Sequence, residues 1–139
     1  MTKRVCTLFG VSLLATVLTV AQANRTIEVN VVYTGAGKVD AGHKIYVALW
    51  NSPNLEGPPA AVEPLASKSG MVTFKNVNVP AYVTTAYDPS GRWDAQTPPP
   101  TGASLGMYST KIPTPDPINV EPGKTAKIKL SFDDSNKKP

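Results

Sequence analysis

The sequence predicts an all-β protein, an antiparallel β-sandwich of about seven strands with Greek-key connections. Short stretches alternate apolar and polar residues with the period of two that is typical of half-buried strands. Turn-forming Gly, Pro, Asn and Asp residues separate these stretches. After residue 23, no window of about 11 residues keeps a helical period without meeting Pro or Gly. A β-barrel is the alternative architecture that this pattern leaves open.

Residues 1–23 have the pattern of a secretory signal peptide that precedes the sandwich. Lys3 and Arg4 come before an apolar run at residues 5–20, and Ala-Gln-Ala closes the segment at residues 21–23. The run is interrupted by Thr and Ser and is shorter than the roughly 20 apolar residues that a spanning helix needs. We therefore expect cleavage after residue 23, a secreted or periplasmic product and no stable membrane insertion. Retention of the segment as an anchor is the alternative.

The mature chain is expected to form one sandwich domain at residues 24–132, followed by a frayed polar tail at residues 133–139. Cys6 lies in the predicted signal peptide, so the mature chain has no cysteine for disulfides, thiolate chemistry or metal binding. One hydrophobic core must therefore stabilise the domain, which its length permits. The formal net charge of the whole chain is +4, and its basic residues are spread rather than clustered. This distribution does not indicate a nucleic-acid-binding surface.

The first two strands are predicted at residues 26–33 and 43–50. The first alternates apolar residues such as Ile27 and Val29 with polar ones. The second, HKIYVALW, is apolar on both sides, which predicts a central strand whose outer face is covered by a loop. The Pro-rich residues 51–64 that follow predict a loop, with a short strand near residues 62–67.

Residues 71–94 contain the pair of strands around which the chain is organised. A strand at residues 72–77 and a strand at residues 82–87 meet at the corner Asn78-Val79-Pro80. The first places Val72 and Phe74 on one side, and the second is rich in β-branched and aromatic residues. Asp88-Pro89-Ser90-Gly91 then has the composition of a turn.

The long loop at residues 88–108 contains three consecutive prolines and is near 20 residues long. Loops longer than about 12 to 15 residues are uncommon in compact domains, so we expect this loop to be either functional or mobile. A short strand is predicted at residues 107–112. The last strand, at residues 125–132, directs Ile128 and Leu130 inward and lysines outward.

Several motifs resemble the prealbumin-like β-sandwich modules, particularly the carboxypeptidase regulatory-like (transthyretin-like) domain found in small secreted proteins of unknown function. The resemblance is carried by FKNV at residues 74–77, AYD at residues 86–88, WD at residues 93–94 and VALWNSP at residues 47–53. It departs at residues 78–80, where Asn-Val-Pro stands in place of Pro-Pro-Gly, and in a shorter acidic loop. The resemblance implies a prealbumin-like fold and hardly constrains function.

The same superfamily includes an enzyme, hydroxyisourate hydrolase, which uses several histidines, an arginine and a Tyr-Arg-Gly-Ser motif. This chain has a single histidine, His43, and lacks that motif. No nucleophile-base pair or pair of carboxylates stands out in the sequence. We therefore expect no catalytic residues, and we interpret His43 as solvated or locally bonded.

Aromatic residues are the candidates for ligand binding. Trp93, Tyr87, Tyr108 and Trp50 are candidates for a platform on which a sugar ring stacks, and Arg92 stands beside Trp93. Trp93 is the strongest candidate because it lies in a predicted loop. For Trp50, which lies in a predicted strand, core packing is the alternative.

Two carboxylates are candidates for metal binding. Asp88 and Asp94, with Ser90 between them, supply the hard oxygen ligands that Ca²⁺ prefers. The alternative is a turn in which the Asp side chains accept hydrogen bonds from their own backbone.

These observations predict a secreted, non-enzymatic accessory or binding module. We expect the loop at residues 88–108 to contact a carbohydrate or a cell-envelope partner. The alternatives are a structural or protein-interaction module without a small ligand, and a calcium-stabilised domain.

Overall fold

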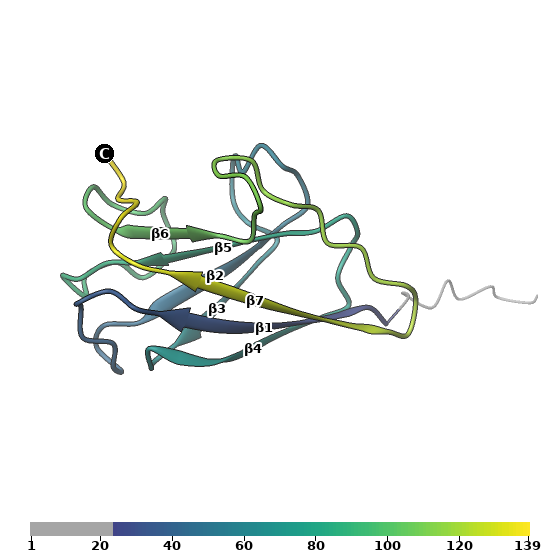
Figure 1. The fold of residues 1–139 in the computed structure, drawn as a ribbon, viewed down its shortest axis with the longest axis horizontal. Coiled ribbons are helices and arrows are strands. Elements are labelled where there is room, and N and C mark those ends of the chain that lie inside the picture. Colours follow the sequence, from purple (N-terminus) through teal and green to yellow (C-terminus); the bar gives the residue numbers. More distant parts are fainter. Residues whose placement is uncertain (1–23) are drawn as a thin grey trace, which may run out of the picture.

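The alternating stretches form seven β-strands in the computed structural model, which describes residues 24–139 (Figure 1). The predicted signal peptide at residues 1–23 lies outside the described residues. The strands are β1 (Thr26–Tyr33), β2 (Ile45–Trp50), β3 (Ala61–Leu65), β4 (Ser69–Lys75), β5 (Tyr82–Tyr87), β6 (Ser104–Met107) and β7 (Thr125–Phe132). The prediction of an all-β domain is confirmed, and the predicted bounds of β1, β5 and β7 coincide with those of the structure.

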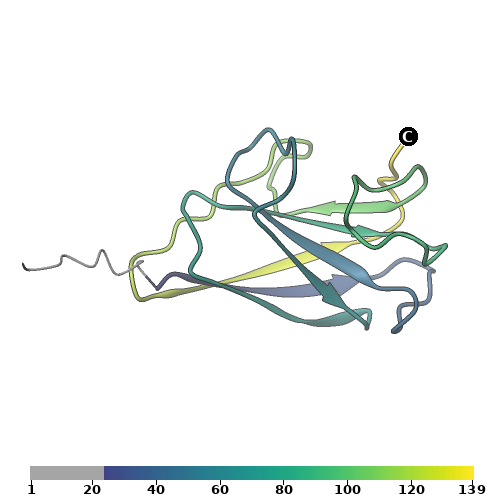
Figure 2. The same cartoon turned by 180° about the vertical axis from the view of Figure 1, so that it is seen from behind.

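Two sheets pack face to face as a β-sandwich (Figures 1 and 2). One has the strand order β4-β1-β7, and the other has the order β3-β2-β5-β6. All neighbouring strands are antiparallel except β1 and β7, which run parallel, so the prediction of an entirely antiparallel sandwich is wrong for this pair. Two parallel strands need a long crossover connection. Here the connection is the whole chain between β1 and β7, which includes the strands of the second sheet.

The core lies between the two sheets. Because β1 is the central strand of its sheet, Ile27, Val29 and Val31 are fully buried. The predicted inward positions Phe74 and Leu130 are also buried. Ile128 is only partly buried, since β7 is an edge strand of the three-stranded sheet.

Strand β2 is central in the four-stranded sheet, as its two-sided apolarity predicts. Ile45, Val47 and Leu49 face the core and are buried. Residues 46, 48 and 50 alternate with them and are half-buried on the opposite side. The outer face of this sheet is therefore apolar as well, and it holds the candidate site.

The sixth strand differs from its prediction. The sequence predicts it at residues 107–112, whereas β6 spans Ser104–Met107, and the long loop is correspondingly shorter. Gly106 interrupts the alternation of apolar and polar residues in β6, so the residue pattern alone does not reveal this strand. A side chain at this glycine would collide with Thr85 and Phe132, so close packing selects glycine here.

The frayed tail expected at residues 133–139 is instead hydrogen-bonded along β6. The Leu105 amide donates to the Asn136 carbonyl over 2.8 Å. The Lys138 amide donates to the Ala103 carbonyl over 2.9 Å, and the Lys138 carbonyl accepts from the Gly102 amide over 2.8 Å. We call residues 133–139 the C-terminal segment, and it extends the four-stranded sheet at its β6 edge.

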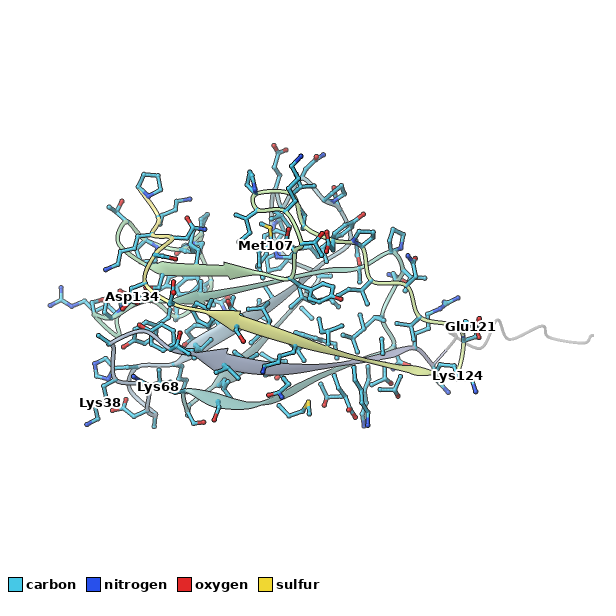
Figure 3. The ribbon with its side chains drawn as sticks, viewed as in Figure 1. Lys38, Lys68, Met107, Glu121, Lys124 and Asp134 are labelled. Carbon is cyan, nitrogen blue, oxygen red and sulfur yellow. The ribbon has the colours of Figure 1, made fainter. Side chains whose placement is uncertain are left out.

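Asp134 anchors the C-terminal segment. Its Oδ1 accepts from the Tyr33 hydroxyl over 2.5 Å and from Ser104 Oγ over 2.7 Å, and its Oδ2 accepts from the Ala36 amide over 2.9 Å. Figure 3 shows Asp134 at the end of the sandwich opposite to Lys124. One carboxylate thus connects β1, β6 and the C-terminal segment.

The hydrogen bonds of Asp134 shift two pKa values in opposite directions. The bond from Tyr33, followed by those from Ser104 and Ala36, lowers the pKa of Asp134 to about 2. Burial, followed by the hydrogen bond to Asp134, raises the pKa of Tyr33 to about 12. Because of both shifts, the phenol stays neutral and the carboxylate stays ionised over a wider pH range.

We predict that Asp134→Asn lowers the free energy of unfolding by about 1–2 kcal/mol near neutral pH, because charge-assisted hydrogen bonds are lost. The folded state depresses the pKa of Asp134. Its contribution is therefore present above the ordinary pKa of about 4 and is lost as the pH falls toward 2. The difference in Tm between wild type and variant should shrink over that pH interval in calorimetric scans. A constant difference would contradict this role. Glu121→Gln, on an exposed residue at the other end of the sandwich, is the control.

Candidate ligand-binding groove

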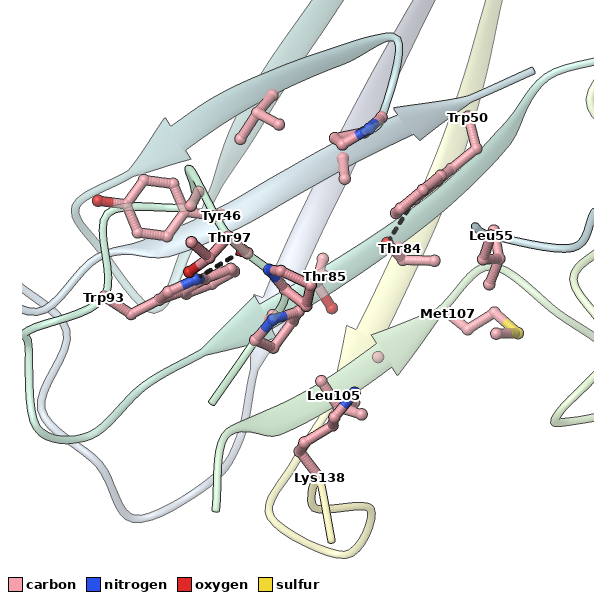
Figure 4. Close-up of a pocket in the computed structure, with 18 of the residues that line it drawn as sticks. Tyr46, Trp50, Leu55, Thr84, Thr85, Trp93, Thr97, Leu105, Met107 and Lys138 are labelled. Atoms are coloured by element: carbon pink, nitrogen blue, oxygen red, sulfur yellow. Dashed lines mark hydrogen bonds between the residues drawn. The ribbon is translucent and has the colours of Figure 1, made fainter. Parts of the chain in front are cut away.

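A groove crosses the outer face of the four-stranded sheet and has a cavity volume of about 780 Å³ (Figure 4). Side chains of β2, β5 and β6 form its floor. The loop that follows β2 and the loop at residues 93–99 form its walls, and both loops contribute prolines. The residues that define this outer-face groove include Tyr46, Ala48, Trp50, Pro58, Pro59, Thr84, Trp93, Gln96, Pro98, Pro99, Leu105, Met107, Asn136 and Lys138.

Both tryptophans of the chain line the outer-face groove. Trp50 Nε1 donates to Thr84 Oγ1 over 2.9 Å. Trp93 Nε1 donates to the Thr97 carbonyl over 2.9 Å. Because both indole N–H groups are already paired within the chain, the apolar ring surfaces are what the tryptophans offer to a ligand.

Tyr46 brings Trp93 onto the sheet. The two ring centroids lie 5.2 Å apart and the ring planes meet at 78°, a T-shaped contact of the kind that aromatic pairs favour. The loop that carries Trp93 thus covers part of the outer face of β2, as the apolarity of that face predicts. Tyr46 was not among the sequence candidates, although its alternation with Ala48 and Trp50 was the signal that places it on this face.

The structure separates the other predicted aromatic residues from Trp93. Tyr87 faces the core and is 2% exposed, its ring lies 4.9 Å from that of Tyr33, and its hydroxyl donates to the Lys38 carbonyl over 2.7 Å. Tyr108 packs against the core and does not line the groove. Of the predicted platform, the groove therefore unites only Trp93 and Trp50.

Asp88 organises the turn that positions Trp93. Its Oδ1 accepts from the Ser90 amide over 3.0 Å, and its Oδ2 accepts from Ser90 Oγ over 2.6 Å and from the Trp93 amide over 3.1 Å. Burial acts to raise the pKa of Asp88, but these hydrogen bonds together outweigh it and lower the pKa. Gly91 in the same turn has a φ of 69°, and a side chain there would collide with the Gly42 carbonyl. The turn therefore requires glycine.

Arg92 lies beside Trp93 but outside the outer-face groove. It lines a smaller hollow of about 380 Å³ together with Trp93, Asp88 and Thr101. The Arg92 side chain is exposed. Trp93 therefore borders both cavities, whereas Arg92 borders only the smaller one.

The predicted calcium ligands serve their own turns. The oxygens of Asp88 accept hydrogen bonds from Ser90 and Trp93, and Asp94 Oδ1 accepts from the Gln96 amide over 3.0 Å. Within residues 24–139, no group of three or more His, Cys, Asp or Glu side chains is placed to hold a metal ion. This geometry favours the alternative interpretation, in which the Asp side chains cap their own backbone.

His43 is bonded locally. Its Nδ1 lies 2.9 Å from Asp40 Oδ1, and Asp40 also accepts from the Gly42 amide over 2.9 Å. The hydrogen bond with His43, which is the largest effect, lowers the pKa of Asp40. Neither residue lines the outer-face groove.

No protein family model, curated protein or solved structure matches this chain. The fold and the site define a β-sandwich with an aromatic-lined surface groove. The resemblance to prealbumin-like modules stays a prediction. In the part of the chain that the structure describes, no helix has the length and apolarity needed to cross a membrane.

We predict that Asp88→Ala lowers the free energy of unfolding by about 1–3 kcal/mol, because the buried carboxylate of Asp88 accepts partly buried hydrogen bonds from Ser90 and Trp93 that the variant loses. Asp94→Ala is the matched control, since it removes one exposed hydrogen bond and should leave Tm nearly unchanged. Thermal melting with calcium and with chelator checks both expectations. A wild-type Tm that rises with calcium, in a manner abolished by Asp88→Ala, would instead establish a calcium site.

Proposed function

We propose that this protein is a secreted, non-enzymatic binding module that holds a carbohydrate chain in the outer-face groove. The observation that carries the proposal is the gathering of both tryptophans and Tyr46 in one groove. Apolar faces of sugar rings stack on aromatic side chains, while polar groups at the rim fix their orientation. The volume of about 780 Å³ lies within the range of small-molecule sites, roughly 300–1,000 Å³.

The length of the groove favours an oligosaccharide over a single sugar. Tyr46 and Trp50 are four positions apart on β2, which corresponds to about 13 Å at roughly 3.3 Å per residue. Trp93 packs on Tyr46, so the two indoles lie toward different ends of the groove (Figure 4). One sugar ring is too small to contact both, whereas several linked rings reach from one to the other.

The composition of the groove supports a binding role without catalysis. Among the described residues that line it, none is Asp, Glu, His or Cys, the side chains that most often act as general acids, bases or nucleophiles. Ala48, Leu105 and Met107 contribute apolar side chains to the floor. Such side chains provide contact area for a ligand.

The proposal also includes export of the protein and a prealbumin-like family, and both of these parts rest on the sequence alone. The pattern at residues 1–23 supports a signal peptide and hence a secreted or periplasmic location. The motifs at residues 74–77 and 86–88 support a prealbumin-like sandwich with Greek-key connections. The loop at residues 88–108 contributes to the proposed contact surface through its segment at residues 93–99.

A protein-interaction module is the second candidate. Aromatic grooves also dock extended proline-rich peptides, which lose little entropy on binding. The prolines in the walls of this groove belong to the chain itself. Both tryptophans stay half-buried, so a proline-rich peptide from a partner can still reach them. A proline-rich peptide is therefore a necessary competitor in any binding assay.

We predict that titration with soluble oligosaccharides of cell-wall polysaccharides produces a saturable change in tryptophan fluorescence. Both tryptophans line the groove, so no other tryptophan contributes background. Trp93→Ala should weaken binding about 5- to 10-fold, because an aromatic stacking contact contributes roughly 1 kcal/mol or slightly more. Tyr108→Phe, which alters an aromatic residue outside the groove, is the control and should bind as wild type does.

Far-ultraviolet dichroism establishes that each variant is folded before affinities are compared. Failure of every oligosaccharide to bind the folded wild type would contradict the proposal. Saturable binding of a proline-rich peptide alone would favour the protein-interaction module.

A further inference from the structure

We infer that the outer-face groove selects acidic glycans, chains of sugar rings that carry carboxylate groups, and that Lys138 recognises the carboxylate. The inference rests on the proposed carbohydrate-binding function and specifies its ligand class. It is carried by the charge of the groove and by the way in which the C-terminal segment is held.

Lys138 is the one charged residue among the described residues that line the groove. Figure 4 shows it beside Leu105, at the β6 side of the floor. The Lys138 residue is half-buried, and apolar surroundings reduce solvent screening, so its charge attracts an anionic group in the groove more strongly than that of a fully exposed lysine does. Glu56 lies in a wall loop, but its side chain is exposed and does not line the groove.

The backbone at Lys138 is fixed rather than free. Its amide and carbonyl are both hydrogen-bonded to residues 102–103 over 2.9 and 2.8 Å. Asp134, a few residues earlier, ties the same segment to Tyr33 and Ser104. At Lys138, binding therefore has to order the side chain and not the backbone, so the entropic cost of recruiting this cation is small compared with that of ordering a free chain end.

The rim of the groove supplies the remaining chemistry that an acidic sugar needs. Gln96 and Asn136 bring amide groups that donate and accept hydrogen bonds with hydroxyls. Trp93 provides a ring surface, and the Lys138 ammonium provides three N–H donors. A stacked ring together with a carboxylate contact distinguishes an acidic glycan from a neutral one, which would leave the cation without a partner.

The test compares one oligomer in two forms, with free carboxylates and with neutral methyl esters, using the protein as exported by its expression host. Tryptophan fluorescence is titrated with oligogalacturonate and with the same oligomer after methyl esterification, with chelator present to exclude calcium bridging. We expect the acidic oligomer to bind at least 10-fold more tightly at low salt. This advantage should decrease as the salt concentration rises, because the contact is partly exposed to solvent.

Two variants test whether Lys138 causes the tighter binding of the acidic oligomer. Lys138→Gln should remove most of the preference for the acidic oligomer while keeping the affinity for the ester, which shows that the groove is intact. Lys137→Gln changes the adjacent lysine, which does not line the groove, and should keep the wild-type preference.

Four results would overturn the inference. Equal wild-type affinity for the acid and the ester overturns the acidic preference and leaves carbohydrate binding in place. A preference that persists in Lys138→Gln overturns the role of Lys138. Displacement of the oligomer by polyglutamate at equal concentration overturns the glycan as ligand and indicates an acidic peptide. If neither oligomer nor a neutral glucan binds the folded protein, the proposed carbohydrate function fails as well.

Discussion

The four-stranded sheet is apolar on both faces, and the other features of the molecule follow from this constraint. One face packs on β1 and its neighbours, with Ile45 and Val47 buried in the core. The opposite face presents Tyr46 and Trp50, which water solvates poorly, so other parts of the chain must cover it. The loops at residues 51–60 and 93–99 cover it only in part. The outer-face groove is the part of that apolar surface that the loops leave accessible.

Two carboxylates hold the segments that frame the groove. Asp88 fixes the turn that leads to Trp93, and Asp134 fixes the segment that leads to Lys138. Both are engaged by hydrogen bonds that lower their pKa values, which identifies them as structural anchors. Residues 24–139 contain no cysteine, so hydrogen-bonded carboxylates supply here the local order that disulfides provide in many small domains. The geometry of the groove therefore depends on residues that do not themselves line it.

Much of the fold is predictable from alternation alone, as the coincident bounds of β1, β5 and β7 illustrate. Strand β6 was missed because Gly106 is selected by close packing against Thr85 and Phe132, which a local pattern does not reveal. Aromatic character alone predicts Tyr87 for the ligand site, but the alternation of β5 places it with Val83 on the core side. The contact of Trp93 with Tyr46 joins segments far apart in the chain. No local signal predicts such a contact.

The C-terminal segment also has a consequence for the free chain in solution. By pairing with β6, it occupies backbone groups that would otherwise be open to a strand from another molecule. At the other end of the same sheet, β3 contains Glu63 and Pro64, and proline has no amide to donate to an added strand. Strand pairing at one border and proline at the other thus oppose edge-to-edge polymerisation of the sheet that bears the groove.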